Sequence, residues 1–202
     1  MPKVGMKPLR QAQLIEATLD SVQEFGLHGT TISTISRKAG VSTGIISHYF
    51  GGKQGLLEAT VRYLLQSLQD ALMNQLRNRP SDDPMERLYA IVEANFSPVQ
   101  VSDRSAKTWL AFWAQAMHDE NLARLQRINE KRLLANLRYS LKALIPKEDV
   151  AQSAQAIAAL IDGLWLRWAL NKGPLDGAKA VAMCKQFIDR TVSSFDASLN
   201  QQ

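Results

Sequence analysis

Two short helical patterns, separated by a break of three to four residues, lie between Thr31 and Lys53. Thr31 and Ser42 precede them, and a hydroxyl at such a position caps a helix by accepting a hydrogen bond from a free backbone N–H group. Gly40 supplies the conformational freedom that a sharp turn needs. This order predicts a helix-turn-helix, although the same order of cap, helix, glycine, cap and helix also occurs in other α-hairpins.

The second of these helices separates apolar from polar side chains. Ile46 and Phe50 lie four residues apart and are expected to face inward, whereas small and polar side chains share the opposite face. In DNA-binding helix-turn-helix motifs, the N-terminal end of the second helix meets base edges in the major groove. We expect base contacts from Thr43, Gly44, Ile45, Ser47 and His48, and phosphate contacts from Thr31, Tyr49 and Lys53.

This stretch resembles the N-terminal DNA-binding domain of TetR-type repressors. The residues that carry the resemblance are Thr30, Thr31, Ile35, Ala39, Gly40, Val41, Ser42, Ile46, Phe50, Lys53 and Leu56. The sequence departs from the family pattern at Ser36, at Ser47, where tyrosine is usual, and at Tyr49, where histidine is usual. The phosphate contact that a tyrosine at position 47 would make is therefore not expected from serine.

Further stretches are similar to the choline-responsive branch of that family, whose members repress glycine betaine synthesis. The matching segments are MPKVGM, GVSTGIISHYFGGKQGLLEAT, KTWLAFWAQAMH and LIDGLWLRWAL. The resemblance implies a homodimer that binds double-stranded operator DNA, takes choline as its effector and controls choline-uptake and betaine-synthesis genes under osmotic stress. A TetR-type repressor that senses a different lipophilic cation is the alternative.

The rest of the chain shows helical patterns and no strand pattern, so the predicted fold class is all-α. We place an N-terminal three-helix DNA-binding domain at residues 1–52 and a helical effector-binding and dimerisation domain at 53–202. The expected helices outside the motif span Leu9–Glu24, Lys53–Arg77, Pro84–Phe96, Ser105–His118, Asn121–Leu144, Asp149–Leu170 and Gly177–Phe195. Gly26, the stretch Asn78–Ser81 and Gly173–Pro174 are expected to end helices.

Positive charge is denser at the start of the chain. The net charge is +5 over 202 residues, and residues 1–62 hold seven Lys or Arg against four acids. Such a balance suits a phosphate-binding surface. Lys3, Lys7 and Arg10 form a basic arm that either solubilises the terminus or reaches into a minor groove.

Other composition features favour a cytoplasmic protein without a membrane segment. Cys184 is the only cysteine, so no intrachain disulfide can form. The basic N-terminus lacks the apolar region of a secretory signal. The most apolar stretch, Ala154–Leu170, is short for a bilayer span and contains Asp162 and Arg167.

No enzyme, cofactor or metal site is predicted. The three histidines, His28, His48 and His118, are scattered, and the lone cysteine lies within a helical apolar pattern. The glycine pair before Lys53 lacks the length and the Ser/Thr of a phosphate-binding loop.

The four tryptophans occur as two pairs at helical spacing, Trp109 with Trp113 and Trp165 with Trp168. Large aromatic residues often fill helical cores. Aromatic faces beside one anion also suit a quaternary ammonium, which is a cation without hydrogen-bond donors on its nitrogen. The expected effector residues are Trp109, Phe112, Trp113, Asp162 and Trp165; Trp168 is the weakest candidate, since it can instead face a dimer partner.

The two C-terminal helices, Ala154–Leu170 and Gly177–Phe195, are expected to form a four-helix interface in a homodimer. The first is apolar almost all round, and its Gly163 would permit close backbone approach. A rival class is a small-molecule carrier that merely retains a helix-turn-helix hairpin, and salt-sensitive operator binding would exclude it.

Overall fold

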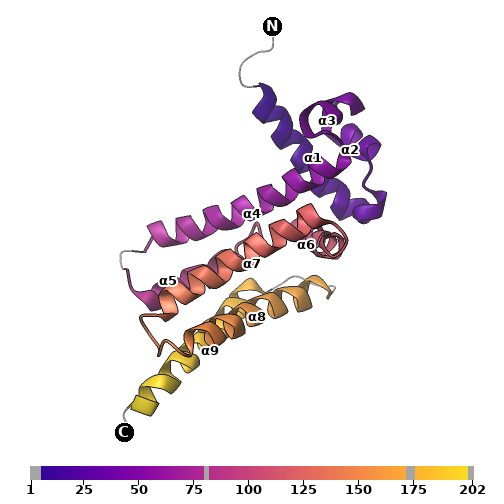
Figure 1. Cartoon of the computed structure of the whole chain (residues 1–202). Coiled ribbons are helices and arrows are strands. Elements are labelled where there is room, and N and C mark those ends of the chain that lie inside the picture. The colour runs from indigo at the N-terminus through magenta and orange to yellow at the C-terminus, as the bar shows by residue number, and fades with distance from the viewer. Residues whose placement is uncertain (1–5, 80–81, 172–175, 200–202) are drawn as a thin grey trace. The chain divides into compact units, whose positions relative to one another are not determined.

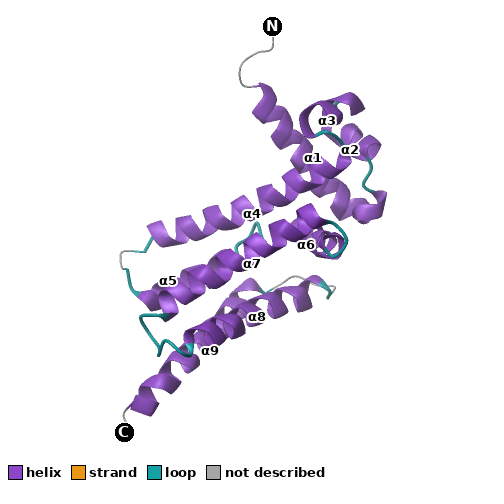
Figure 2. Cartoon of the chain, viewed as in Figure 1, coloured by secondary structure: helices purple, strands orange, loops and turns teal. Residues whose placement is uncertain are grey.

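The computed structural model describes residues 6–79, 82–171 and 176–199, with side chains up to residue 195. These residues form helices and no strand (Figures 1 and 2), which confirms the all-α prediction. The helices are α1 (Met6–Gly29), α2 (Ile32–Ala39), α3 (Thr43–Phe50), α4 (Lys53–Arg77), α5 (Pro84–Asn95), α6 (Asp103–Ala116), α7 (Glu120–Leu141), α8 (Val150–Ala169) and α9 (Gly177–Leu199).

Local capping explains the helix-turn-helix. The Thr31 hydroxyl accepts a hydrogen bond from the Thr34 backbone N–H, and the Thr34 hydroxyl accepts one from the Thr31 N–H, so α2 begins with a capping box. Gly40 ends α2 in the left-handed conformation, with φ 62°. Ser42 occupies the N-cap position of α3, but the prediction that its side chain caps the helix is wrong, because it makes no capping hydrogen bond.

One buried cluster joins the first three helices to the start of α4. Its members, none more than 5% exposed, are Leu14, Ala17, Ile35, Ala39, Ile46 and Leu56. Fully burying a large aliphatic side chain stabilises a fold by about 1.5–3 kcal/mol. The cluster therefore fixes α3 against α1 and α2, as the inward placement of Ile46 predicts.

Helix boundaries agree with the prediction at Gly26 and differ from it at the start of α6. Gly26, with φ 66° and ψ 178°, leaves the helical conformation, so the first helical segment ends there as predicted, and a short further segment within α1 continues to Gly29. Helix α6 begins at Asp103, two residues before the predicted start, because the Ser102 hydroxyl accepts a hydrogen bond from the Ser105 N–H at 3.2 Å.

The chain divides into two compact units. The first is drawn from Met1–Gln66 and Ser102–Gln126, and the second from Ser67–Val101 and Arg127–Gln202. Helix α6 thus belongs to the same unit as the helix-turn-helix and packs against α1, although it follows much later in the sequence. The functional boundary between residues 52 and 53 stays a prediction. Lys3, Pro80–Ser81 and Gly173–Pro174, named in the predictions above, lie outside the described residues.

The second unit combines an apolar core with a network of ion pairs around Glu93. Helix α9 packs against α5 and α8, with Cys184 and Ile188 buried. The Glu93 carboxylate accepts hydrogen bonds from Arg79 at 2.9 Å and from Lys185 at 2.6 Å. Burial alone would raise the pKa of Glu93, but these two cations hold it below its usual value.

Candidate functional site

Helix α3 presents most of its predicted base-contacting residues to solvent. Thr43, Gly44, Ser47 and His48 are exposed. A Cβ added at Gly44 would meet no atom within 4 Å, so the protein itself leaves this point of the helix surface open. Ile45 is only partly exposed and packs against the buried cluster of the helix-turn-helix.

The predicted phosphate-contacting residues differ in their surroundings. Thr31 is exposed, yet its hydroxyl is engaged in the capping box of α2. Tyr49 is partly buried against the helix-turn-helix cluster, and its ring lies 4.9 Å from that of His48, centroid to centroid. Lys53 is partly buried at the first position of α4.

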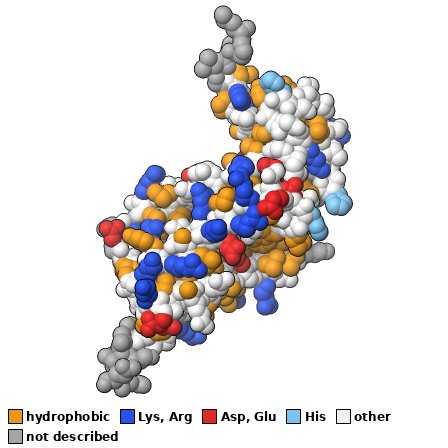
Figure 3. Space-filling view, viewed as in Figure 1, with side chains coloured by type: hydrophobic (Ala, Val, Ile, Leu, Met, Phe, Trp, Pro, Cys, Tyr) orange, Lys and Arg blue, Asp and Glu red, His pale blue; other side chains and the backbone are white. Residues whose placement is uncertain are grey.

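Residues 31–53 contain no acidic side chain, and in Figure 3 the surface over α2 and α3 is mainly uncharged. Arg37, exposed on α2, adds a cation that the sequence prediction did not include. The sequence feature that could have indicated Arg37 is its place directly after Ile35 and Ser36, which face inward. Neighbouring Lys38 is instead paired with Glu24 at 2.5 Å and lies over the Phe25 ring.

The three predicted effector residues of α6 form one aromatic cluster. The Trp109 ring lies 5.6 Å from that of Phe112 and 6.2 Å from that of Trp113. Trp109 and Phe112 are each 4% exposed. The Trp113 indole N–H donates a hydrogen bond to the Gln126 side chain at 3.1 Å, which fixes the orientation of that ring.

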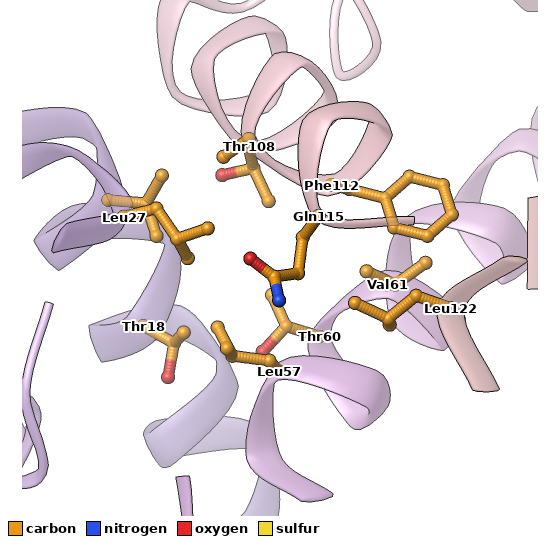
Figure 4. Close-up of a pocket in the computed structure, with 11 residues that line it drawn as sticks. Thr18, Leu27, Leu57, Thr60, Val61, Thr108, Phe112, Gln115 and Leu122 are labelled. Atoms are coloured by element: carbon orange, nitrogen blue, oxygen red, sulfur yellow. The ribbon is translucent and has the colours of Figure 1, made fainter. Parts of the chain in front are cut away.

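A pocket opens in the first unit, among α1, α4, α6 and the start of α7 (Figure 4). It is lined by Thr18, Val22, Leu27, Leu57, Thr60, Val61, Thr108, Ala111, Phe112, Gln115 and Leu122. Phe112 is the one predicted effector residue among them. No tryptophan and no charged side chain lines this pocket, so it lacks the features expected for a site that binds a quaternary ammonium.

Helix α8 places Asp162 and Trp165 one turn apart. Trp165 is 6% exposed and its ring meets that of Trp168 edge to face at 5.9 Å. Asp162 is reachable by solvent and forms no ion pair within the part of the chain that the structure describes. Surrounding protein nevertheless desolvates the carboxylate, and together with the charge of Glu130 this raises the pKa of Asp162 to about 6.

The helices predicted to dimerise expose apolar side chains in pairs. Leu166 in α8 is 38% exposed, and Leu170, at the C-cap of α8, is 68% exposed. Met183 and Phe187 in α9 are 45% and 37% exposed. Each pair is spaced by four residues and therefore shares a helix face. Among the described helices, none has the length and apolarity needed to cross a bilayer.

Two family models match the chain. The model for bacterial regulatory proteins of the tetR family covers residues 14–60, and the model for the C-terminal part of BetI-type transcriptional repressors covers residues 84–193. The chain is also 50% identical over 188 residues to the HTH-type transcriptional regulator BetI of Klebsiella pneumoniae strain 342. That match covers 93% of this chain and 96% of the relative.

Solved structures agree in fold. A putative transcriptional regulator from Pseudomonas aeruginosa PAO1 superposes with a TM-score of 0.79 at 29% identity, covering 92% of this chain and 91% of that one. A putative regulator from Saccharomonospora viridis, solved in complex with choline, gives 0.76 at 21% identity and covers 90% and 96%. All three are named as transcriptional regulators, two of them as putative ones. The present chain belongs to the TetR family of bacterial regulatory proteins, as a repressor with a BetI-type C-terminal domain.

Proposed function

We propose that this repressor binds its operator as a homodimer, takes choline as its effector, and controls genes for choline uptake and glycine betaine synthesis. The observation that carries the proposal is the 50% identity to a BetI regulator over nearly the whole chain. A TetR-type repressor that senses another lipophilic cation is the second candidate, because the aromatic residues would serve any such cation.

For DNA, the proposal assigns base reading to the exposed face of α3. Thr43, Ser47 and His48 offer hydroxyl and imidazole groups, and each good bidentate base contact is worth about 1–3 kcal/mol. Thr31, Tyr49 and Lys53 are assigned to phosphates, which set the position of the protein without reading sequence. Ile45 is retained as a thymine-methyl contact, although its partial burial leaves less of its surface for DNA.

For the effector, the proposal assigns Trp109, Phe112 and Trp113 from α6 and Asp162 and Trp165 from α8. A desolvated cation–π contact is worth about 2 kcal/mol or more, so a few indole contacts can hold a quaternary ammonium. Asp162 supports this assignment because it is an accessible carboxylate without an ion-pair partner among the described residues. The similar structure from Saccharomonospora viridis, which was solved in complex with choline, supports the assignment by analogy.

For assembly, the proposal assigns the dimer interface to the exposed apolar pairs of α8 and α9. A two-fold dimer doubles the contacts that one helix-turn-helix can make on a near-palindromic operator. A Cβ added at Gly163 would meet nothing within 4 Å in its own chain, so that part of α8 is open to a partner helix.

A fluorescence titration tests the effector assignment. Choline, glycine betaine and the uncharged isostere 3,3-dimethylbutan-1-ol are added to the protein with and without operator DNA, and tryptophan emission is followed. Choline should bind most tightly, and by linkage operator DNA should weaken choline binding by the factor that choline weakens operator binding. Equal binding of choline and the isostere would contradict a cation site.

Variants separate pocket residues from core residues. Trp113→Phe and Asp162→Asn should weaken choline binding while operator affinity stays within twofold, whereas Trp168→Phe serves as the matched control on α8. Normal choline responses in Trp113→Phe, Trp109→Phe and Asp162→Asn would mean that these side chains only fill the fold. A gel shift that shows no operator retention at any salt concentration would instead favour a carrier protein.

A further inference from the structure

A single guanidinium joins α6 to α1 within the first unit. Arg104, in the first turn of α6, donates hydrogen bonds from Nη1 to Glu16 Oε2 at 2.6 Å and to Asp20 Oδ1 at 3.1 Å. The two carboxylates lie one turn apart on α1. Hydrogen bonds between charged partners are shorter than neutral ones, and this contact, here called the Arg104 clamp, is a polar anchor between the start of α6 and α1.

Weaker contacts flank the clamp. The Gln23 side chain donates to Asp103 Oδ2 at 2.9 Å, and Lys107 donates to the Gln23 backbone carbonyl at 3.3 Å. Partial burial lowers the pKa of Arg104, but Asp20 and Glu16 raise it by more, so the guanidinium stays charged at any pH at which the protein is folded. All the polar contacts in this group lie at the N-terminal end of α6.

Helix α1 is tied to the helix-turn-helix by a separate set of contacts. The Gln13 side chain donates to the Ala39 carbonyl at 2.6 Å, and the Ser21 and Thr34 hydroxyls are 3.2 Å apart. Leu14 and Ala17 also belong to the buried cluster that holds α3. A displacement of α1 must therefore displace α2 and α3 as well.

A pocket lies between α1 and α6 beyond the clamp. Thr18 and Val22 of α1 and Thr108 and Phe112 of α6 line the pocket shown in Figure 4, and the Gln115 side chain points into it. Atoms that border unfilled space lose dispersion contacts on that side. The two helices otherwise pack closely along their length. The Arg104 clamp adds a polar anchor at the N-terminal end of α6, outside the pocket.

From this geometry we propose that Arg104 is a positioning residue through which effector binding on α6 displaces α1 and the helix-turn-helix. The inference rests on the effector function proposed above. Trp109 and Trp113 follow Arg104 on the same helix, so a ligand that favours one position of α6 favours one position of α1. A ligand changes DNA affinity only if it prefers one of two such arrangements.

The test compares operator affinity with and without saturating choline, and the ratio of the two dissociation constants is the coupling factor. Arg104→Met keeps the aliphatic stem and removes the charge. The coupling factor should fall at least fivefold towards one, while the choline dissociation constant of the DNA-free protein stays within twofold. Because partly exposed ion pairs contribute little to stability, circular dichroism should show an intact fold.

Two further variants make the outcome specific. Arg62→Met also removes one positive charge and breaks an exposed ion pair, with Glu58, inside α4; it should keep the wild-type coupling factor. Arg104→Lys should restore part of the coupling that Arg104→Met loses. A wild-type coupling factor in Arg104→Met, or an equal loss in Arg62→Met, would overturn the role of the clamp and leave the proposed function intact. If the operator affinity of the wild-type protein did not change with choline, the proposal that choline is the effector would be wrong.

Discussion

A side chain at Gly55 would place its Cβ 1.9 Å from the carbonyl oxygen of Phe50. No side chain can be accommodated at that separation, so glycine is required where α4 passes the end of α3. Gly51, with φ 72°, makes the turn between the two helices. This close approach fixes α3 against α4, which the sequence pattern of the motif alone did not indicate.

Gly44 is the contrasting case, since a Cβ there meets no protein atom within 4 Å. Gly44→Trp should therefore fold normally but lose operator binding at least tenfold, because the indole would hold α3 away from the bases. Gly44→Ala is the matched control, and better helix propensity should stabilise it by about 0.5–1 kcal/mol. Thermal melts and gel shifts measure the two effects. Unchanged operator affinity in Gly44→Trp would show that this end of α3 does not face DNA.

Lys53, at the start of α4, is assigned to a phosphate. Lys53→Ala should weaken specific and non-specific DNA about equally and lower the slope of log affinity against log salt by about one unit. Lys131→Ala, which removes the same charge from an exposed position on α7, is the control and should change neither. Fluorescence anisotropy at several salt concentrations provides the measurement. A loss restricted to one operator sequence would make Lys53 a base-reading residue.

Ser36 carries a buried hydroxyl that makes no hydrogen bond with the described residues, and its side chain is only 3% exposed. Leaving a buried polar group unpaired costs about 1–3 kcal/mol. Ser36→Ala should therefore raise the free energy of unfolding by about 1 kcal/mol in urea titrations. The exposed Ser33→Ala on the same helix should change it by less than about 0.5 kcal/mol. A destabilised Ser36→Ala would indicate a hidden partner for the hydroxyl.

Sequence reasoning predicted the features that depend on local periodicity and capping. The helix-turn-helix, the span of α4 from Lys53 to Arg77 and the inward face of α3 follow from residues a few positions apart. The clamp joins Arg104 to Asp20 and Glu16, which come 84 and 88 positions earlier in the sequence. No local pattern predicts which of many charged residues will meet over such separations. The early start of α6 shows the same limit, because Ser102 competes with Ser105 as the first residue of the helix.

The exposed apolar pairs of α8 and α9 predict how the dimer can be broken. Leu166→Glu combined with Phe187→Glu should convert a micromolar dimer to monomer in sedimentation velocity, since both changes would bury unpaired charge at the proposed interface. Met73→Glu on α4 replaces an equally exposed apolar residue, 42% exposed, and should leave the dimer intact. Monomeric wild-type protein at micromolar concentration would refute the assignment.

Choline affinity should depend on pH through Asp162. Desolvation of this solvent-reachable carboxyl by the surrounding protein, with help from Glu130, raises its pKa from 3.8 to about 6, so the folded protein holds a proton there that the unfolded chain has lost. The stabilising contribution of that proton is complete below about pH 3.8 and disappears as the pH rises through about 6.

A quaternary ammonium beside Asp162 favours the ionised carboxylate, so the ligand must displace the proton below about pH 6 and not above it. Choline should therefore bind more weakly at pH 5 than at pH 7.5, by calorimetry, and the uncharged isostere should show no such change. Asp162→Asn should flatten the profile and, by removing a desolvated charge, stabilise the ligand-free protein at pH 7.5. Glu130→Gln should move the midpoint of the pH dependence of choline affinity to lower pH, because it removes the negative charge that helps to raise the pKa of Asp162. Choline binding that is equally tight at both pH values in the wild type would mean that Asp162 does not face the cation.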